Sequence, residues 1–559
     1  MTSICLFLSI LTGMAVGNHL RIDKFSGMFI TYVGLAAVSL LAAMFGALYH
    51  FSLLLVAVLI TGTCIYLRSF STKEFFPYLA FFITCFLVLS FRNNGAEFHI
   101  WDDFSYWGLV AREIFLNGRI PFDNPHLSYL NYIPIFGSFI GAMQNATSFG
   151  HNIFNEGDAL LVQGTFLLIT ISVISTEIAG QNRMKWFFCF SLFYLAAFSV
   201  VHGFRTLMID GVLALVFLVS LILGHRHWLL DDKPSLILFL ISVGFLGFLK
   251  PSAIGYSVIV AGFFVFGFCD FRSRYKSKLA LIFVVTLIIV LTKFYLWQVD
   301  INLGKSSHTT FSLTKIIGEF DGFRDTVVRV FQSFYSPFYS GSQGGFSKIG
   351  FCVFITHLIL PVLCWSDLLT KRFVLVFYLA SAAFCACLAV NYATNMSSGE
   401  AADLHSFDRY AGTFVIGMTG MLFYLVSVKS QKVWSIIFSM LVIIISDFKG
   451  VGYFSHPLSH SGRIQQRESI AMVDGGVDRY KKIVFDSFCD SGQAYLMTRF
   501  DFRDHIVELI DTCGLTDDEA NALLQDRQGV DFLVVSRRNP DDFRKQPDRS
   551  PNVIFVGND

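Results

Sequence analysis

An acidic pair flanked by tryptophans is the feature of this sequence best suited to chemistry. The segment HIWDDFSYWGLVAREIF places Asp102 beside Asp103, and residues 104–116 are predicted to form an amphipathic helix. Adjacent carboxylates in a partly desolvated place can have their pKa values shifted apart, so that one of them acts as a general base. The ordinary alternative is an aromatic belt at a membrane surface, with Asp103 capping the helix that follows.

Further charges stand at the ends of apolar runs. Arg205 and Asp210 lie between two runs in HGFRTLMIDG, Lys250 precedes a proline in FLKPSAIGY, and Arg409 opens another run in FDRYAG. Dipole pairing of Asp210 and snorkelling of Lys250 would explain each residue singly. Together, cations at membrane depth suit a lipid phosphate, because they neutralise its oxygens strongly where water is scarce. With a carboxylate to take a proton from an acceptor hydroxyl, the set predicts group transfer from a phospholipid-like donor.

Composition identifies the class of protein that must position these residues. Of 559 residues, 54% are hydrophobic and only 15% are charged, and 63 are Phe. Soluble proteins carry about 25% charged residues. The sequence therefore predicts a polytopic α-helical protein in a lipid bilayer. The net charge of +1 gives no support to nucleic-acid binding, so no nucleic-acid partner is expected.

Apolar runs of about 20 residues predict about 14 transmembrane helices. Basic residues fall in alternate short loops, which places those loops in the cytoplasm by the positive-inside rule. The long loops 92–157, 298–348 and 392–410 and the tail from about residue 448 are then external, and Arg205 and Lys250 go against the charge trend. The predicted helices lie near 1–17, 27–48, 51–67, 76–91, 158–180, 186–202, 211–224, 235–249, 252–269, 279–297, 349–365, 373–391, 411–428 and 433–447.

The tail, 448–559, is predicted to be a small extracytoplasmic α/β domain that follows a transmembrane domain over 1–447. Its alternating helix and strand patterns support this interpretation, and the absence of a Gly-rich loop after the first strand argues against nucleotide binding. Cys489 and Cys513 could pair in an oxidising compartment. The expected strands lie at 481–488, 505–510, 530–536 and 552–557, and the expected helices at 462–480 and 516–527.

These motifs resemble a known family. WDDFSYWG is similar to the WDEFSHWG-type signature of bacterial GT-C fold integral-membrane glycosyltransferases, relatives of the protein O-mannosyltransferase and aminoarabinose transferase group. The family's Tyr-Pro-Pro element is matched by YIPI from Tyr132, with Ile133 replacing the first proline. Its later Asp, Lys-Pro and Ser-Phe-x-Arg-Tyr elements are matched at Asp210, at Lys250 and at 406–410, and the tail resembles a small domain of some members.

The resemblance implies an inverting glycosyltransferase of the bacterial inner membrane, with its active site facing the periplasm. The donor would be a polyprenyl-phosphate-linked sugar, and the acceptor a cell-envelope glycan or glycolipid such as lipopolysaccharide O-antigen. No cofactor is required, although paired carboxylates could hold a divalent cation. By resemblance Asp102 is the general base and Asp103 its neighbour at the acceptor. Substrate-binding roles, with phosphate binding at the cations, fall to Lys250, Arg409, Arg205, Asp210, Tyr132, Tyr410 and Trp107.

Two alternatives remain open. One is a polysaccharide polymerase or ligase acting on lipid-linked glycans, which would use a lipid pyrophosphate donor and would be expected to carry more external arginines. The other is a lipid-linked sugar transporter or flippase, which would be expected to show internal repeats and a midplane site. No repeat is evident, and the charges gather at one face. Both observations favour the glycosyltransferase.

Overall fold

The chain folds into a helical bundle and a smaller unit that contains a sheet. The computed structural model describes residues 1–68, 76–98, 100, 102–122, 132–148, 153–180, 182–199, 204–268, 274–303, 320–336, 347–365, 370–395, 404, 406–429, 470, 482–486, 493–502, 506–510, 519, 532–536 and 553–555. Contacts within the chain divide it into unit 1, residues 1–93 and 110–454, and unit 2, residues 94–109 and 455–559.

Unit 1 confirms that the chain is a multi-pass helical membrane protein. Among the described residues, nine helices are long and apolar enough to cross a bilayer. They are α1 (Thr2–Leu20), α2 (Lys24–Met44), α3 (Leu48–Arg68), α7 (Glu156–Ala179), α9 (Asp210–Leu230), α12 (Tyr275–Leu303), α15 (Lys348–Trp365), α16 (Lys371–Asn395) and α18 (Phe407–Lys429).

The remaining apolar helices of unit 1 are shorter. They are α4 (Phe76–Asn93), α8 (Arg183–Ser199), α10 (Lys233–Phe248) and α11 (Ala253–Gly262), which continues into the π-helical segment η2 (Phe263–Phe268). Every predicted transmembrane run overlaps one of these helices or one of the nine, except 433–447, which lies outside the described residues. The helix positions were therefore predictable, whereas the expected number of 14 crossings stays a prediction.

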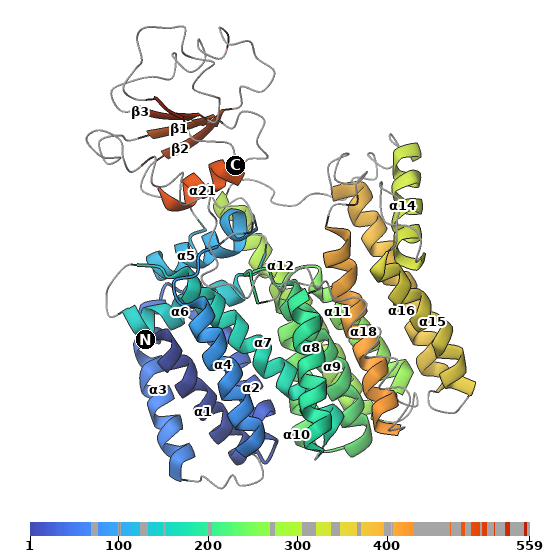
Figure 1. Ribbon diagram of the computed structural model, residues 1–559. Helices are drawn as coiled ribbons and strands as arrows, with labels where there is room; N and C mark the ends of the chain where they lie inside the picture. Colours follow the sequence, from blue (N-terminus) through green and yellow to red (C-terminus); the bar gives the residue numbers. More distant parts are fainter. Residues whose placement is uncertain are drawn as a thin grey trace. The chain divides into compact units, whose positions relative to one another are not determined.

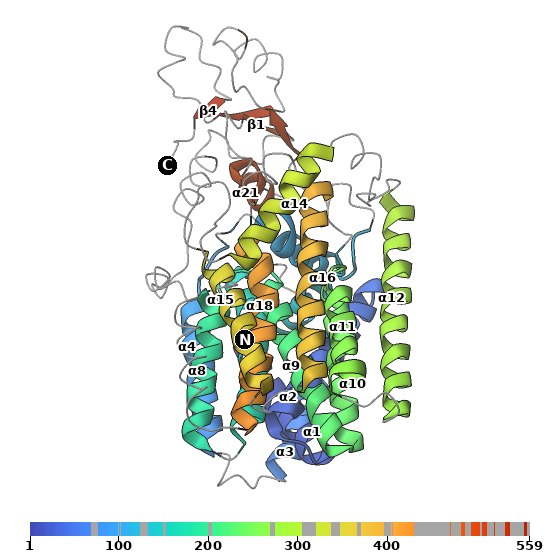
Figure 2. The same ribbon diagram turned by 90° about the vertical axis from the view of Figure 1, so that its right-hand side faces the viewer.

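The interior of the bundle is formed by α7, α9 and α18, which are apolar on all sides and almost wholly buried. Figure 1 shows α7 running between α2 and α8. In contrast, α12 and α3 bury only about a third of their spanning windows or less. In Figure 2, α12 lies at the rim of the bundle. Their exposed apolar side chains are what a helix facing lipid requires.

Small residues allow the first two helices to cross closely. A Cβ added to Gly27 of α2 would lie 2.4 Å from the backbone oxygen of Gly13 in α1, so a larger residue would separate the helices. The turn between them is fixed by Asp23, whose side chain accepts a hydrogen bond of 2.8 Å from the backbone N–H of Ser26. This is an N-cap, which satisfies one of the free donors of the first turn of α2.

Two helices of unit 1 were not predicted as helices. α6 (Ile135–Ser148) lies within the predicted external loop 92–157 and packs against α2 and α3. At 14 residues it is too short to cross a bilayer. α14 (Phe320–Tyr335) lies within the predicted loop 298–348 and packs against α15 and α16. Its strongly amphipathic sequence was the available signal.

Unit 2 contains a parallel sheet with strand order β2-β1-β3-β4. Its strands are β1 (Lys482–Asp486), β2 (Ile506–Ile510), β3 (Phe532–Ser536) and β4 (Val553–Phe555), with α21 (Gln493–Asp501) between the first two. All four predicted strands are thus confirmed as strands. In the register, Ile483 of β1 lies opposite Val507 and Leu533. Apart from residues 470 and 519, the predicted helices at 462–480 and 516–527 lie outside the described residues. So do both cysteines, Cys489 and Cys513.

Candidate functional site

Three of the predicted site residues meet in one ionic cluster of unit 1. Asp210 forms an ion pair with Lys250 through Oδ1, and its Oδ2 lies 3.3 Å from Nε of Arg409. Asp210 is 4% exposed and Lys250 is 8% exposed. Within the described part of the chain, one buried carboxylate therefore faces two cations. We call Asp210, Lys250 and Arg409 the cation cluster.

The ends of three neighbouring helices position the cation cluster. Asp210 is the first residue of α9, Lys250 follows the end of α10, and Arg409 lies in the first turn of α18. α9 packs against both other helices, which brings the three ends together. A carboxylate in a first turn also interacts favourably with the helix dipole. Helix packing thus brings together Asp210 and Arg409, which are about 200 residues apart in the sequence.

Tyr410 lies against both cations of the cluster. Arg409 donates a hydrogen bond of 3.0 Å from Nη2 to the Tyr410 hydroxyl, and its guanidinium lies 4.9 Å from the centre of the Tyr410 ring. The Lys250 ammonium is 5.6 Å from the same ring centre. Cation–π contacts of this kind hold cations in place without neutralising them. Tyr410 therefore orients the cations while leaving their charge available.

The segment preceding α9 is held by buried polar side chains that the sequence analysis missed. Gln163 of α7 donates to the backbone oxygens of Thr206 at 2.8 Å and Met208 at 3.3 Å. The Met208 sulfur in turn accepts from Nη1 of Arg409 at 2.7 Å. This segment, 204–209, therefore connects α7 with the cation cluster. A glutamine inside an apolar run was the signal that could have revealed it.

Arg205, predicted as a third phosphate ligand, lies next to another arginine. Its guanidinium is 5.3 Å from the Phe198 ring centre, and it interacts electrostatically with Arg92 of α4. Arg92 donates through Nη2 to the backbone oxygen of Phe204 and is itself buried. Arg92 was missed, although a basic residue at a helix end predicted to be external goes against the positive-inside rule, just as Lys250 does.

The acidic pair belongs to unit 2. The π-helical turn η1 (Asp103–Trp107) begins there and continues into α5 (Gly108–Asn117). Asp102 precedes the turn, is partly exposed and makes no capping hydrogen bond. Asp103 is buried inside the turn, so the interpretation of Asp103 as a helix cap is wrong. π-Helical turns inside α-helices are frequent at functional sites.

Aromatic packing connects the acidic turn with the tail of the chain. Phe500 of α21 lies 5.8 Å from Phe98 and 5.7 Å from Phe104, measured between ring centres, and all three rings are buried. A Cβ at Gly108 would lie 2.3 Å from the Phe98 ring, so glycine is required there. Trp107 contacts Tyr106, with ring centres 4.3 Å apart. The carboxylates are thus supported by residues of the C-terminal segment.

Tyr132 completes the predicted set. It is partly exposed, and its backbone oxygen accepts a hydrogen bond of 3.4 Å from the Tyr295 hydroxyl of α12. Within the described part of the chain, no three His, Cys, Asp or Glu side chains are grouped so that they could hold a metal ion. Convergence of the acidic pair with the cation cluster stays a prediction, since the two belong to different units.

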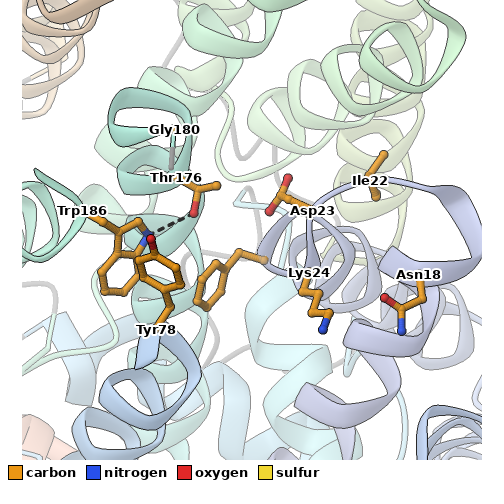
Figure 3. Close-up of a pocket in the computed structure, with 9 residues that line it drawn as sticks. Asn18, Ile22, Asp23, Lys24, Tyr78, Thr176, Gly180 and Trp186 are labelled. Carbon is orange, nitrogen blue, oxygen red and sulfur yellow. Dashed lines mark hydrogen bonds between the residues drawn. The ribbon is translucent and has the colours of Figure 1, made fainter. Parts of the chain in front are cut away.

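A cavity of about 270 Å³ lies at the opposite ends of the helices. Figure 3 shows it between the turn joining α1 to α2, the end of α7 and the start of α8, where Trp186 donates from Nε1 to Thr176 Oγ1 at 3.0 Å. Asp23 and Lys24 also line it. Nearby, Arg226 forms an ion pair with Glu177 and lies 4.0 Å from Asp23. None of these residues was predicted as a site residue.

The fold and the site define a class, the polytopic α-helical membrane proteins with a buried cation cluster at one end of the bundle. No family model matches the chain, and neither a curated protein nor a solved structure matches it.

Proposed function

We propose that the protein is an inverting glycosyltransferase that uses a polyprenyl-phosphate-linked sugar. The observation that carries this proposal is the cation cluster, in which one buried carboxylate faces Lys250 and Arg409. Two cations held beside a single carboxylate favour the binding of a phosphate group. Guanidinium and ammonium groups bind phosphate oxygens strongly where water is excluded.

In the proposed mechanism, Asp102 takes the proton of an acceptor hydroxyl. The acceptor oxygen then attacks the anomeric carbon, forming the new glycosidic bond while the bond to the lipid phosphate breaks. Lys250 and Arg409 stabilise the charge on the leaving phosphate, and electrostatic stabilisation of this kind often contributes more to catalysis than any other effect. Asp210 holds both cations at fixed positions. Asp103, the neighbour of Asp102, contributes to acceptor binding.

The setting proposed for this reaction is the bacterial inner membrane. Helix ends that carry the cation cluster would face the periplasm, and so would a C-terminal α/β domain over 448–559. The acceptor would be a cell-envelope glycan or glycolipid such as lipopolysaccharide O-antigen. The packing of Phe500 against Phe98 and Phe104 supports a role for the tail in shaping the acceptor side of the acidic turn.

The test is sugar transfer from a lipid-linked donor in membranes containing Asp102→Asn. Loss of a general base lowers turnover by about 100- to 10,000-fold. The matched control is Asp325→Asn, an exposed acid of α14, which should leave turnover unchanged. Unimpaired transfer by correctly inserted Asp102→Asn protein would remove the proposed base.

A further inference from the structure

Arg92 is a buried cation whose hydrogen bonds are incomplete. It is 5% exposed, its Nη2 donates to the Phe204 backbone oxygen, and its Nε donates to Oδ1 of Asn93 at 3.2 Å. Nη1 is buried and has no hydrogen-bond partner among the residues that the structure describes. No carboxylate forms an ion pair with Arg92 in the part of the chain that the structure describes. A buried guanidinium without a counter-ion is energetically costly, so the site is built for a charge that arrives from elsewhere.

Asn93 adds a second free donor beside the first. The residue is 2% exposed, and its Oδ1 is used by Arg92. Its Nδ2 is buried and makes no hydrogen bond within the described residues. Adjacent side chains therefore carry two buried N–H groups that lack acceptors. Buried donors of this kind ordinarily have partners, so both point to an acceptor that the described part of the chain does not supply.

Arg205 increases the positive potential at the same place. It interacts electrostatically with Arg92, and the backbone of its neighbour Phe204 fixes the Arg92 guanidinium. Two guanidiniums held near each other repel, and an anion between or beside them relieves that repulsion. Arginine pairs are suited to phosphate because each presents a planar fork of donors.

We propose that Arg92 and Asn93, with Arg205 beside them, form a second oxyanion site that binds a phosphate-type group. The site is separate from the cation cluster, but the segment 204–209 connects the two. Arg92 contacts this segment at Phe204, and Arg409 contacts it at Met208. The identity of the ligand rests on the proposed function. Because the proposed donor is a monophosphate, the oxyanion is either a phosphate of a lipid diphosphate acceptor or a phosphate group of a separate ligand.

The experiment measures binding to the full chain in nanodiscs of phosphatidylcholine. The probes are a polyprenyl monophosphate, a polyprenyl diphosphate and inorganic phosphate, and the readout is tryptophan fluorescence. In Arg92→Gln, affinity for either the polyprenyl diphosphate or inorganic phosphate should fall by about tenfold or more, as expected for a lost charged hydrogen bond. Affinity for the monophosphate should change by less than about threefold. Loss with the diphosphate assigns the site to a lipid-linked acceptor, and loss with inorganic phosphate assigns it to a separate ligand.

Asn93→Asp keeps the inference testable should Arg92→Gln fail to fold. The new carboxylate would pair with Arg92 inside the protein, so the temperature of unfolding should hold or rise while anion binding is lost. A purely structural Arg92 predicts the same stability with no change in anion affinity. The matched control is Arg119→Gln, at an exposed arginine of the same unit, which should bind every probe like the unmodified protein.

Unchanged affinities in Arg92→Gln and Asn93→Asp would overturn the inference, and so would equal losses in Arg119→Gln. Failure of the proposed function has a different signature. In that case the unmodified protein would not bind the polyprenyl monophosphate, while binding of inorganic phosphate would still depend on Arg92.

Discussion

The two ends of the helical bundle in unit 1 carry opposite balances of buried charge. Helix α9 begins at Asp210 and reaches Arg226 about 24 Å further along, at 1.5 Å per residue. At the Asp210 end, one carboxylate faces Lys250 and Arg409. At the Arg226 end, one guanidinium lies between the carboxylates of Asp23 and Glu177.

This difference separates a binding role from a structural role. At the Arg226 end the guanidinium lies against two carboxylates, and an excess carboxylate can be neutralised by a proton. At the Asp210 end the excess is cationic, and an arginine cannot lose its charge. An anion from outside the chain would be bound favourably beside these two cations. We therefore expect substitutions at the first end to alter stability and substitutions at the second to alter binding and turnover.

The largest expected effect is on stability, in Arg226→Met. Removing the guanidinium leaves Asp23 and Glu177 without their cation, which should lower the free energy of unfolding by about 3 kcal/mol. This value is at the lower end of the usual range because Arg226 and Asp23 keep 24% of their side-chain surface exposed. Thermal unfolding in nanodiscs measures it. Turnover per folded molecule should stay unchanged.

The control for Arg226→Met is the double variant with Glu177→Gln. Neutralising the carboxylate that pairs with Arg226 should recover part of the lost stability, because one unpaired buried charge is then removed. A drop in turnover without any loss of stability in Arg226→Met would erase the contrast between the two ends.

The next effect is on catalysis, in Lys250→Met. Asp210 keeps Arg409 as its partner, so the fold should hold, whereas half of the positive charge offered to a phosphate is lost. We expect kcat/KM for sugar transfer to fall by about 100-fold. The same substitution at the opposite end is Lys185→Met, which removes a hydrogen bond of 3.0 Å to the Ser427 backbone oxygen. Equal loss of transfer in both variants would contradict a special role for the cation cluster.

Sequence alone could predict the members of the cation cluster because each stands at the end of an apolar run. Lys250 and Arg205 also go against the positive-inside rule, and Arg92 carries the same signal in FRNNG. What the sequence could not show is which cations adjoin, since that depends on helix packing over long separations. The electrostatic interaction of Arg205 with Arg92 is an example, whereas a role for Arg205 beside Lys250 stays a prediction.

Helix positions were predictable because apolar runs of bilayer length have few other folds available. The ion pair of Arg226 with Glu177 was not predictable, because both lie inside apolar helices whose neighbours the sequence does not specify. For the acidic pair, the helix that follows was predicted, but its π-helical start and its contact with Phe500 were not. Aromatic contacts between segments nearly 400 residues apart leave no local pattern.

A smaller effect is expected in Tyr410→Phe. The ring stays beneath both cations, and only the hydroxyl that accepts from Arg409 is removed. A lost hydrogen bond to a charged group corresponds to about 1.5 kcal/mol, or roughly a tenfold decrease in kcat/KM. Tyr410→Leu is the comparison, because it also removes the cation–π contacts and should decrease transfer further. If both variants transfer sugar equally well, Tyr410 does not orient the cations.

The smallest expected effect is at the cavity near the Arg226 end, in Trp186→Phe. The indole donates to Thr176, and phenylalanine keeps most of the ring packing while losing this hydrogen bond. We expect the free energy of unfolding to fall by about 1 kcal/mol, with sugar transfer unchanged. Thr176→Val removes the acceptor from the other side and should give a similar loss. Should either variant instead slow transfer while leaving stability intact, the cavity of about 270 Å³ would have a part in the reaction cycle, and the Arg226 end could no longer be treated as structural.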